Sequence, residues 1–145
     1  FIMDYLKVLV EEIHSVVVAT VDETGHPHTT VMDMMWEDGK TVYFLTADFK
    51  PLYKRLKEDG RVAVTGMTQG AGTMDRKFIS LTGQVKWLGK EHLEELLKAN
   101  PYMYEIYPTE EGRSHLQVFR FKNAVGNFYD LTQLPPYQAR FEIEG

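Results

Sequence analysis

The chain contains no cysteine. This absence excludes disulfide bonds, thiolate nucleophiles, zinc ribbons and cysteine-ligated iron–sulfur clusters, and it agrees with a reducing compartment. The chain also lacks any apolar run near the roughly 20 residues that a membrane span needs, and its first residues show no small-residue cleavage site. From these absences we expect a soluble, cytoplasmic protein without a membrane partner.

An excess of positive charge is missing too. The formal net charge is −5 at pH 7, whereas a general nucleic-acid binder normally presents a positive surface. The length of 145 residues fits one ordinary domain, residues 1–145, which can bury about two-thirds of its unfolded surface without disulfides. We therefore expect a single domain with one core and no nucleic-acid partner.

The usual signatures of metal, hydrolytic and nucleotide chemistry are absent as well. The five histidines show no metal-ligand spacing, and no Gly-x-Ser-x-Gly motif is present. The glycines of residues 69–73 lack both the GxGxxG spacing and the lysine of a Walker loop. We predict no metal site and no catalytic side chain of these classes.

What the chain does contain is a succession of strand-forming segments separated by turns. Runs of β-branched and aromatic residues alternate with clusters of Gly, Pro and Asp, which predicts hairpin-connected strands. The expected strands are 15–22, 28–36, 41–46, 61–67, 77–87, 116–122 and 127–131, the first three as a meander. Gly83 suggests a bend or bulge in the fifth strand.

Helical spacing of apolar residues predicts three helices, over 3–13, 51–59 and 90–99, with Asp4 as the N-cap of the first. Residues 102–107 fit either a short helix or a loop, and the tail after 131 contains Pro135 and Pro136. The expected fold is mainly β within the α+β class. It is an antiparallel closed or split β-barrel of six to seven strands with flanking helices.

The helix at 51–59 begins with charges of the wrong sign. Pro51 suits a first helical position, and Lys50, Lys54, Arg55 and Lys57 surround it. Cations beside the positive end of a helix are disfavoured by ~0.3–1 kcal/mol each. A bound phosphate would reverse this penalty, with the Thr46 hydroxyl, the Lys50 ammonium and the Leu52 and Tyr53 amides as donors. The alternative is a solvated basic face, partly balanced by the nearby carboxylates Asp48, Glu58 and Asp59.

The strand at 28–36 has no face that is polar throughout, so we expect both faces to be covered. Met32, Met34 and Met35 supply polarisable side chains that either lie against a planar ring or simply fill the core. Asp33 lies between Val31 and Met35 and needs a partner if it is buried. A ligand ring N–H, a backbone N–H or an arginine would each serve, whereas on an edge strand the carboxylate would simply be solvated.

Four segments together carry a family resemblance: residues 19–30, 42–56, 61–64 and 81–85. They read Ala-Thr-Val-Asp-Glu-Thr-Gly-His-Pro-His-Thr-Thr, Val-Tyr-Phe-Leu-Thr-Ala-Asp-Phe-Lys-Pro-Leu-Tyr-Lys-Arg-Leu, Arg-Val-Ala-Val and Leu-Thr-Gly-Gln-Val. Over roughly residues 5–131, their order resembles the pyridoxamine 5'-phosphate oxidase-like family of FMN-binding split barrels. The resemblance implies a homodimer with FMN in the cleft between the subunits.

The resemblance also assigns roles to residues. It implies that residues 28–34 line the flavin ring, that Thr46 and Lys50 hold the phosphate, and that Lys77 and Phe78 approach the cofactor of the other subunit. Together with the basic helix, this gives a predicted cofactor-binding set, namely Thr30, Met32, Asp33, Met34, Thr46, Ala47, Lys50, Pro51, Tyr53, Lys54, Lys77 and Phe78. Trp36 or Tyr53 is expected to wall the cavity.

The chain departs from true pyridoxamine phosphate oxidases in two places. Strand 28–36 lacks the Arg and Lys that those enzymes usually carry, and no Arg-x-His segment follows near Arg140. We therefore expect an FMN-dependent oxidoreductase that reduces another small organic acceptor with electrons from a nicotinamide donor. The alternatives are a flavin- or haem-binding or sensing module without turnover, and an empty dimeric scaffold.

Overall fold

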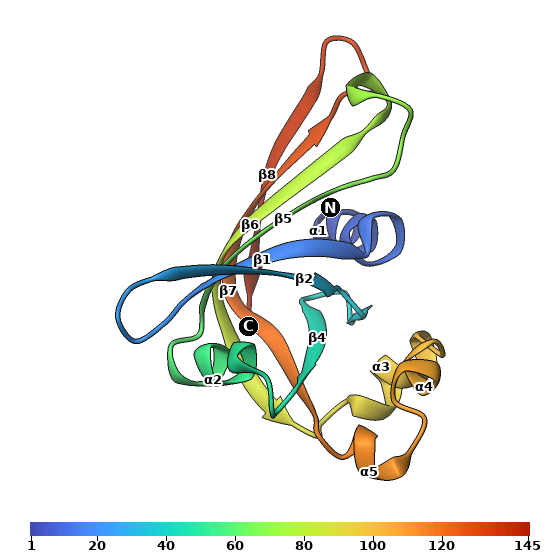
Figure 1. Cartoon of the computed structure of the whole chain (residues 1–145). Helices are drawn as coiled ribbons and strands as arrows, with labels where there is room; N and C mark the ends of the chain where they lie inside the picture. Colours follow the sequence, from blue (N-terminus) through green and yellow to red (C-terminus); the bar gives the residue numbers. More distant parts are fainter.

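The computed structural model describes residues 1–145, and its main feature is a strongly curled antiparallel sheet (Figure 1). The strands are β1 (Ser15–Val21), β2 (Pro27–Asp33), β3 (Trp36–Glu37), β4 (Val42–Ala47), β5 (Arg61–Met67), β6 (Lys77–Gly89), β7 (Leu116–Asp130) and β8 (Tyr137–Glu144). The helices are α1 (Ile2–Lys7), α2 (Pro51–Glu58), α3 (Leu93–Ala99), α4 (Met103–Ile106) and α5 (Glu110–Arg113). A π-helical turn η1 (Val8–Ile13) extends α1, and a 3-10 turn η2 (Thr73–Asp75) precedes β6.

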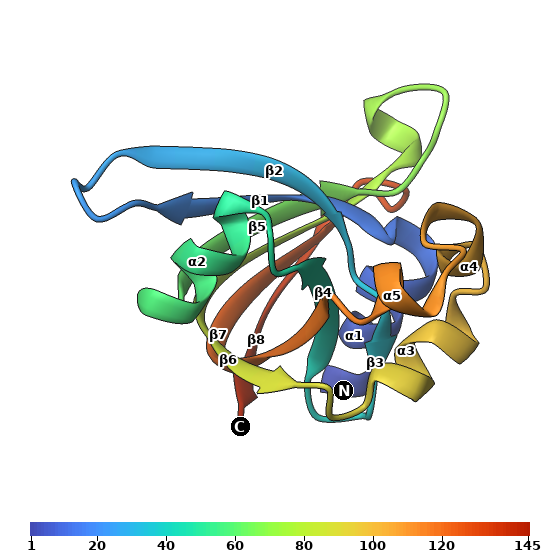
Figure 2. The ribbon, with the colours of Figure 1, turned by 60° about the horizontal axis from the view of Figure 1, so that its bottom comes forward.

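The strand order is β2-β1-β5-β6-β7-β4-β3, with β8 also beside β7. The long strand β7 pairs with β6 on one side. On its other side, the first third of β7 pairs with β4 and its last half pairs with β8. Strand β7 therefore connects the two parts of the sheet, which curl around the core (Figure 2). The split-barrel, mainly β architecture is as predicted, although β8 makes eight strands where six to seven were expected.

The two hairpins of the predicted meander are confirmed, β1 with β2 and β3 with β4, but the three strands do not form one continuous meander. Strand β2 pairs only with β1, and β4 pairs with β3 and β7. The predicted strand 28–36 breaks between Asp33 and Trp36, because the Met34 and Met35 amides leave the ladder and donate to the carbonyls of His14 and Tyr43. The sheet is thus open between the edge strand β2 and β4, and this opening is the split of the barrel.

The interior of the curl is apolar and aromatic. Phe44, Phe119 and Phe121 are fully buried, and the rings of Phe44 and Phe119 stack with centroids 5.8 Å apart. Helices α1 and α2 add Leu6, Leu52 and Leu56 to this core, while α3 and α4 cover a second buried cluster around β4 and the start of β7. The helices thereby close the ends of the curl, and none of them is long and apolar enough to cross a bilayer.

The N-terminal helix differs from the predicted helix over 3–13. Helix α1 begins at Ile2, so Asp4 lies inside its first turn and is not the N-cap. The second half widens into η1, whose last bond runs from the His14 N–H to the Leu9 carbonyl, five residues back. His14 then takes a positive φ of 61° as the chain turns into β1.

Two predicted strands at the C-terminal end are one continuous strand, and the tail forms another. Residues 123–126 stay in β7 because Gly126 leaves room for Phe141 on the neighbouring strand. The Phe141 ring lies 2.2 Å from the position that a Cβ at residue 126 would take. The tail after Pro136 alternates outward polar and inward apolar side chains and forms β8. The irregularity predicted at Gly83 is confirmed, since the register of β6 against β7 shifts between Gln84 and Val85.

Candidate functional site

A cavity of about 570 Å³ lies in the split of the barrel, between β2 and β4, with α2 at one end and α4 at the other. Its volume is in the range of small-molecule and cofactor sites. The cavity is lined by His28, Thr29, Thr30, Val31, Met32, Asp33, Met35, Leu45, Thr46, Ala47, Lys50, Pro51, Leu52, Arg55, Met103, Ile106 and Tyr107. The site therefore lies where the sheet fails to close.

One part of the cavity wall is apolar. Met32 from β2 and Leu45 and Ala47 from β4 are almost fully buried in the chain, and they border the cavity from two sides. Helix α4 adds Met103 and Ile106, of which Ile106 is 60% exposed. Walls of this kind suit a flat apolar ligand, because the thioether and aliphatic groups offer polarisable contacts and no competing hydrogen bonds.

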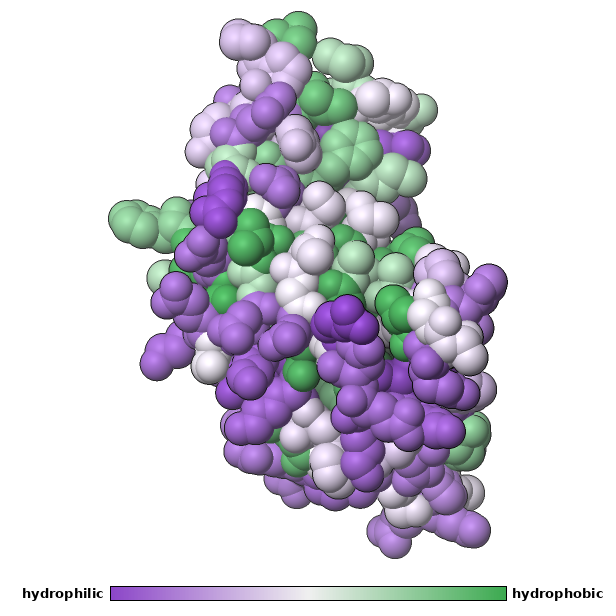
Figure 3. Space-filling model, turned by 90° about the vertical axis from the view of Figure 1, so that its left-hand side faces the viewer, coloured by the Kyte–Doolittle hydropathy of each residue, from purple (hydrophilic) through white to green (hydrophobic).

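The opposite part is the start of α2, and it is cationic. Lys50 is the N-cap in extended conformation, Pro51 occupies the first turn, and no acidic residue lies in that turn. The Tyr53 N–H donates to the Lys50 carbonyl at 3.1 Å. Of the Leu52 and Tyr53 amides, which we expected to be free, only the Leu52 amide is free. The surface around α2 is mostly hydrophilic in the lower half of Figure 3, whereas apolar residues collect in the upper half. An anion at this helix end would be stabilised by Lys50 and by the helix dipole.

The carboxylates that could have balanced these cations are engaged elsewhere. The Asp48 carboxylate contacts His115 Nδ1 at 2.9 Å and Gln117 Nε2 at 3.3 Å, and the first contact holds the pKa of Asp48 below its usual range. Asp59 pairs with Arg61 at 2.7 Å. Glu58 forms no ion pair, so the alternative of a basic face balanced by Asp48, Glu58 and Asp59 lacks the contacts it needs.

Arg55 is a cation of the site that the predicted cofactor-binding set did not include. Its Nε donates to Thr20 Oγ1 at 2.8 Å, which fixes the guanidinium one turn into α2 at the cavity wall. The lysine and arginine side chains that form ion pairs with carboxylates are those of Arg61, Lys77 and Arg140. Lys50 and Arg55 thus both line the cavity without a carboxylate partner.

The structure brings seven of the twelve predicted residues to the cavity. They are Thr30, Met32, Asp33, Thr46, Ala47, Lys50 and Pro51. Thr46 is 4% exposed and lies at the end of β4, next to the α2 start. These residues come from three separate elements and meet only because the split places β2 opposite β4.

The other five predicted residues lie outside the cavity. Met34 is fully buried in the core. The Tyr53 ring packs edge-on against Phe119 with centroids 6.1 Å apart, and Lys54 is an exposed residue of α2. Lys77 and Phe78 lie at the start of β6. The Lys77 Nζ pairs with Glu12 at 3.1 Å, and Phe78 borders a shallow groove on the outer side of the sheet.

Trp36 does not wall the cavity either, since its ring packs against Tyr43 with centroids 4.9 Å apart. The residues that sequence reasoning missed are chiefly Met103 and Ile106 of α4 and Tyr107, which follows that helix. Residues 102–107 fitted a helix or a loop equally well, and no local signal connects them to a site some 60 residues earlier. Arg55, by contrast, belonged to the basic cluster already recognised around α2.

The Asp33 carboxylate has two hydroxyl partners within the chain, and neither a backbone N–H nor an arginine is among them. Ser15 Oγ donates to Oδ1 at 2.6 Å, and the Tyr102 hydroxyl donates to Oδ2 at 2.7 Å. The expectation that both faces of β2 are covered is also wrong for this chain alone, because Val31 is 70% exposed. Asp33 is therefore held at the cavity by two hydroxyl groups and not by a backbone amide or an arginine.

Residues 2–129 match the family model described as pyridoxamine 5'-phosphate oxidase. This match covers most of the chain. The chain belongs to the pyridoxamine 5'-phosphate oxidase family. No curated protein matches this family member by sequence.

Solved structures share the fold of this family member at low sequence identity. A NimC/NimA family protein from Clostridium acetobutylicum is 21% identical with a TM-score of 0.75, over 97% of this chain and 89% of that one. A heme binding protein from Mycobacterium smegmatis is 12% identical with a TM-score of 0.70, over 96% and 57%. An F420 reductase is 19% identical with a TM-score of 0.61, over 79% and 90%. At these identities the likeness shows the split-barrel fold.

Proposed function

We propose that this family member is an FMN-dependent oxidoreductase that reduces a small organic acceptor with electrons from a nicotinamide donor. The observation that carries the proposal is the cavity in the split, which has an apolar wall and a cationic helix start without carboxylate partners. FMN combines a flat ring system with a phosphate and needs both environments within one site. The family and its structural neighbours, which include an F420 reductase, support a flavin-type oxidoreductase or binder.

The residues of the cavity fit this cofactor by their chemistry. Lys50 and the Leu52 N–H would hold the phosphate, and Thr46 would add a hydroxyl donor at the end of β4. Arg55 would contribute a second positive charge. Met32 and Ala47 would border the ring system, and FMN, when bound, would supply the electron-transfer chemistry. Pyridoxamine phosphate is not the substrate we propose, because strand 28–36 lacks the Arg and Lys that the true oxidases usually carry.

Homodimerisation is part of the proposal and rests on the outer face of the sheet. Val31 and Val17 face each other across β2 and β1 and are 70% and 39% exposed. Met67 and Phe78 border the same shallow groove, beside the open split. A second copy of this chain on that face would bury these apolar side chains, and it would bring a partner surface next to the cavity.

The competing proposal is a module that binds flavin or haem without turnover, and the structural likeness to a heme binding protein favours including haem. Haem iron is often held by histidine, and His28 lines the cavity. However, His28 Nε2 lies 2.9 Å from Asp22 Oδ2, which occupies one of its ring nitrogens. The contact with His28 also lowers the pKa of Asp22, so this pair is most stable with an ionised carboxylate.

The first test is the visible absorption spectrum of the purified protein, repeated on the supernatant after heat denaturation. We expect bands of oxidised flavin that pass into the supernatant, as non-covalent binding requires. If the protein is purified without colour, it is titrated with FMN, and we expect the FMN fluorescence to be quenched. A Soret band would favour haem, and a colourless protein that neither quenches FMN fluorescence nor binds haem would leave only the scaffold.

Turnover separates the enzyme from the binding module. We expect the flavin-loaded protein to oxidise NADH or NADPH in the steady state when an organic acceptor such as menadione is present. The control is the same amount of free FMN under the same conditions. A rate equal to that of free FMN, despite full flavin occupancy, would contradict the enzymatic proposal and favour the non-catalytic module.

A further inference from the structure

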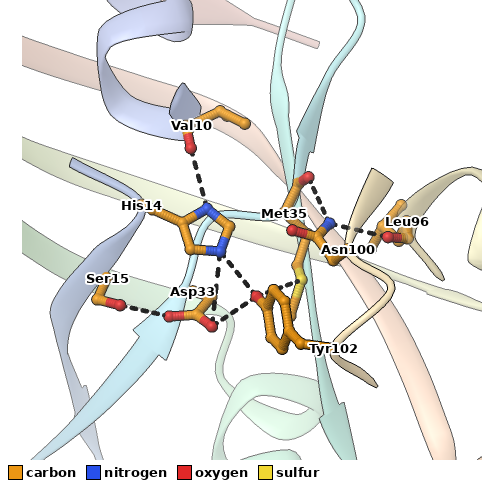
Figure 4. Close-up of polar contacts among 8 residues, drawn as sticks. All are labelled: Val10, His14, Ser15, Asp33, Met35, Leu96, Asn100 and Tyr102. Carbon is orange, nitrogen blue, oxygen red and sulfur yellow. Dashed lines mark hydrogen bonds and ion pairs between the residues drawn. The ribbon is translucent and has the colours of Figure 1, made fainter. Parts of the chain in front are cut away.

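His14, Tyr102 and Asp33 form a chain of short hydrogen bonds at the edge of the cavity (Figure 4). His14 Nε2 lies 2.7 Å from the Tyr102 hydroxyl, which lies 2.7 Å from Asp33 Oδ2. At the other side of the imidazole, Nδ1 lies 2.9 Å from the Val10 carbonyl oxygen. The direct distance from His14 Nε2 to Asp33 Oδ2 is 3.6 Å, so the hydroxyl is the link between them.

Counting protons shows that this cluster holds one proton more than a neutral histidine and an ionised aspartate would carry. A carbonyl oxygen only accepts, so His14 Nδ1 carries a proton and donates it to Val10. The two 2.7 Å contacts of Tyr102 each need a proton, and the hydroxyl has only one. The second proton is therefore on His14 Nε2 or on Asp33 Oδ2. Met35 Sδ, 3.5 Å from the hydroxyl, is too weak an acceptor to change this count.

The two positions of the extra proton differ only by shifts along the hydrogen bonds. With the proton on His14, Nε2–H donates to Tyr102 and the hydroxyl donates to Asp33. With the proton on Asp33, the carboxyl O–H donates to Tyr102 and the hydroxyl donates to Nε2. Burial and the bond to Asp33 raise the pKa of Tyr102, which keeps the hydroxyl protonated as the middle member in both states.

The two ends of the cluster open into different cavities. Asp33 lines the cavity in the split, together with Lys50 and Arg55. His14 lines a second cavity of about 500 Å³, whose walls include Glu11 and Glu37. The His14 and Asp33 side chains are 29% and 26% exposed, so each end reaches solvent or ligand while the cluster itself is sheltered.

The backbone at His14 is also unusual. It follows the π-helical turn η1 and has φ 61° and ψ −66°, a conformation that costs a non-glycine residue of order 1–3 kcal/mol. The His14 carbonyl accepts from the Met34 N–H at 2.7 Å, which fixes it against the break after β2. Such strained positions and π-helical turns are frequent at functional sites.

We propose that His14, Tyr102 and Asp33 form a proton relay that delivers protons from solvent in the second cavity to a ligand in the split. The inference rests on the proposed function for its proton acceptor, a small organic molecule that gains two electrons and becomes basic. Asp33 touches the ligand and is the proton donor, whereas Tyr102 and His14 are positioning and conducting residues behind it.

The proposed step conserves protons and charge. With the extra proton on His14, Nε2–H passes its proton to the Tyr102 oxygen while the Tyr102 hydroxyl passes its own proton to Asp33 Oδ2. The Asp33 O–H bond formed in this way breaks as that proton bonds to a reduced oxygen or nitrogen atom of the acceptor, which leaves Asp33 ionised and His14 Nε2 without a proton. A water molecule in the second cavity then gives one proton to His14 Nε2 and leaves a hydroxide ion in the solvent. No electrons move along the relay.

The first test needs no flavin and no turnover. In protein labelled with 15N-histidine, NMR at pH 7 and low temperature should show two slowly exchanging downfield protons near His14, one on Nδ1 and one shared with Tyr102. Tyr102→Phe keeps the ring and removes only the hydroxyl, and it should abolish the second signal and keep the first. The control is Tyr104→Phe, an exposed residue of α4, which should keep both. Detection of the Nδ1 proton alone in the unaltered protein would overturn the relay.

The second test uses flavin-loaded protein, photoreduced without oxygen and mixed with either menadione or ferricyanide. Menadione takes up protons as it is reduced, whereas ferricyanide takes up electrons alone. Because general acid catalysis typically contributes 10²–10⁴ in rate, Tyr102→Phe should slow reoxidation by menadione about a hundredfold and leave ferricyanide unchanged. Equal slowing with both acceptors would indicate a structural role, and no slowing with either would exclude the relay. If the protein binds no FMN, the proposed function fails, and the NMR test alone decides the relay.

Discussion

At the scale of single residues, position relative to the split separates side chains that look alike in the sequence. Lys50 and Lys54 are both lysines of the basic cluster, four positions apart, but only Lys50 lines the cavity. Met32 and Met34 are two residues apart and both belong to the core, but only Met32 also lines the cavity. The sequence pointed to all four residues, but it could not show which residue of each pair lines the cavity.

The lysine pair gives a matched test of the phosphate site. Lys50→Glu removes a charge-assisted hydrogen bond, worth about 1.5–3 kcal/mol, and places a like charge beside the phosphate. We expect FMN binding, measured by fluorescence titration, to weaken by at least roughly tenfold to a hundredfold in Kd. The control Lys54→Glu makes the same change of net charge outside the cavity and should weaken binding by less than about fivefold, as for exposed charge contacts.

Equal losses in the two variants would mean that only the overall charge of α2 matters. Full FMN occupancy in Lys50→Glu would mean that the phosphate lies elsewhere. Both outcomes contradict the assignment of Lys50, and neither bears on the hydrogen bond between Tyr102 and Asp33.

At the scale of elements, the crossing of β6 and β7 determines how tightly the sheet curls. At Gly83 the two backbones approach so closely that a Cβ would lie 1.9 Å from the Asn123 carbonyl oxygen and 2.6 Å from the Ala124 Cα. The register shift follows directly, between Gln84 and Val85. The sequence marked this position because a glycine inside a strand commonly indicates a bulge or a close approach.

Gly83→Ala should therefore destabilise the fold. The neighbouring atoms are backbone and cannot move aside as a flexible side chain would, so we expect a loss of at least about 1–3 kcal/mol in the free energy of unfolding. Urea denaturation followed by circular dichroism measures this loss. Gly72→Ala is the control, because no atom lies within 4 Å of its added Cβ, and it should leave the midpoint almost unchanged. Equal midpoints for the two variants would contradict the close packing at Gly83.

At the scale of the whole molecule, the outer face of the sheet changes character from one side to the other. One row of cross-strand neighbours runs along it, consisting of Val31, Val17, Thr65, Ser80, Asn127 and Arg140. The row is apolar on β2 and β1, next to the split, and polar on β7 and β8. The proposed dimer contact belongs to the apolar end, where a partner would also stand beside the cavity.

Val31→Glu should weaken the proposed homodimer, because pairing would bury an uncompensated carboxylate, which is costly in free energy. We expect analytical ultracentrifugation to show a shift from dimer to monomer. The control Val125→Glu introduces the same charge on β7, opposite Glu142 and away from β2, and should stay dimeric. A monomeric unaltered protein that binds FMN fully would contradict the dimer and leave the cavity assignment intact.

The sequence by itself determined the local elements and the fold class. Alternation, turn residues and the Lys-Pro helix start are short-range signals, so β1, β4, β5, β6 and α2 fall where the pattern predicts them. It also determined the cationic helix end, because charge and helix polarity follow from neighbouring residues alone.

Only the tertiary structure decided which residues meet. The gap between β2 and β4 replaces the predicted meander, because strand pairing depends on partners far along the chain, such as β7 for β4. The same long-range packing brings α4 to the cavity and places Tyr102 between His14 and Asp33, residues separated by 88 and 69 positions from it. Contacts of this kind leave no local pattern in the sequence, since each side chain meets its partners only when the chain folds.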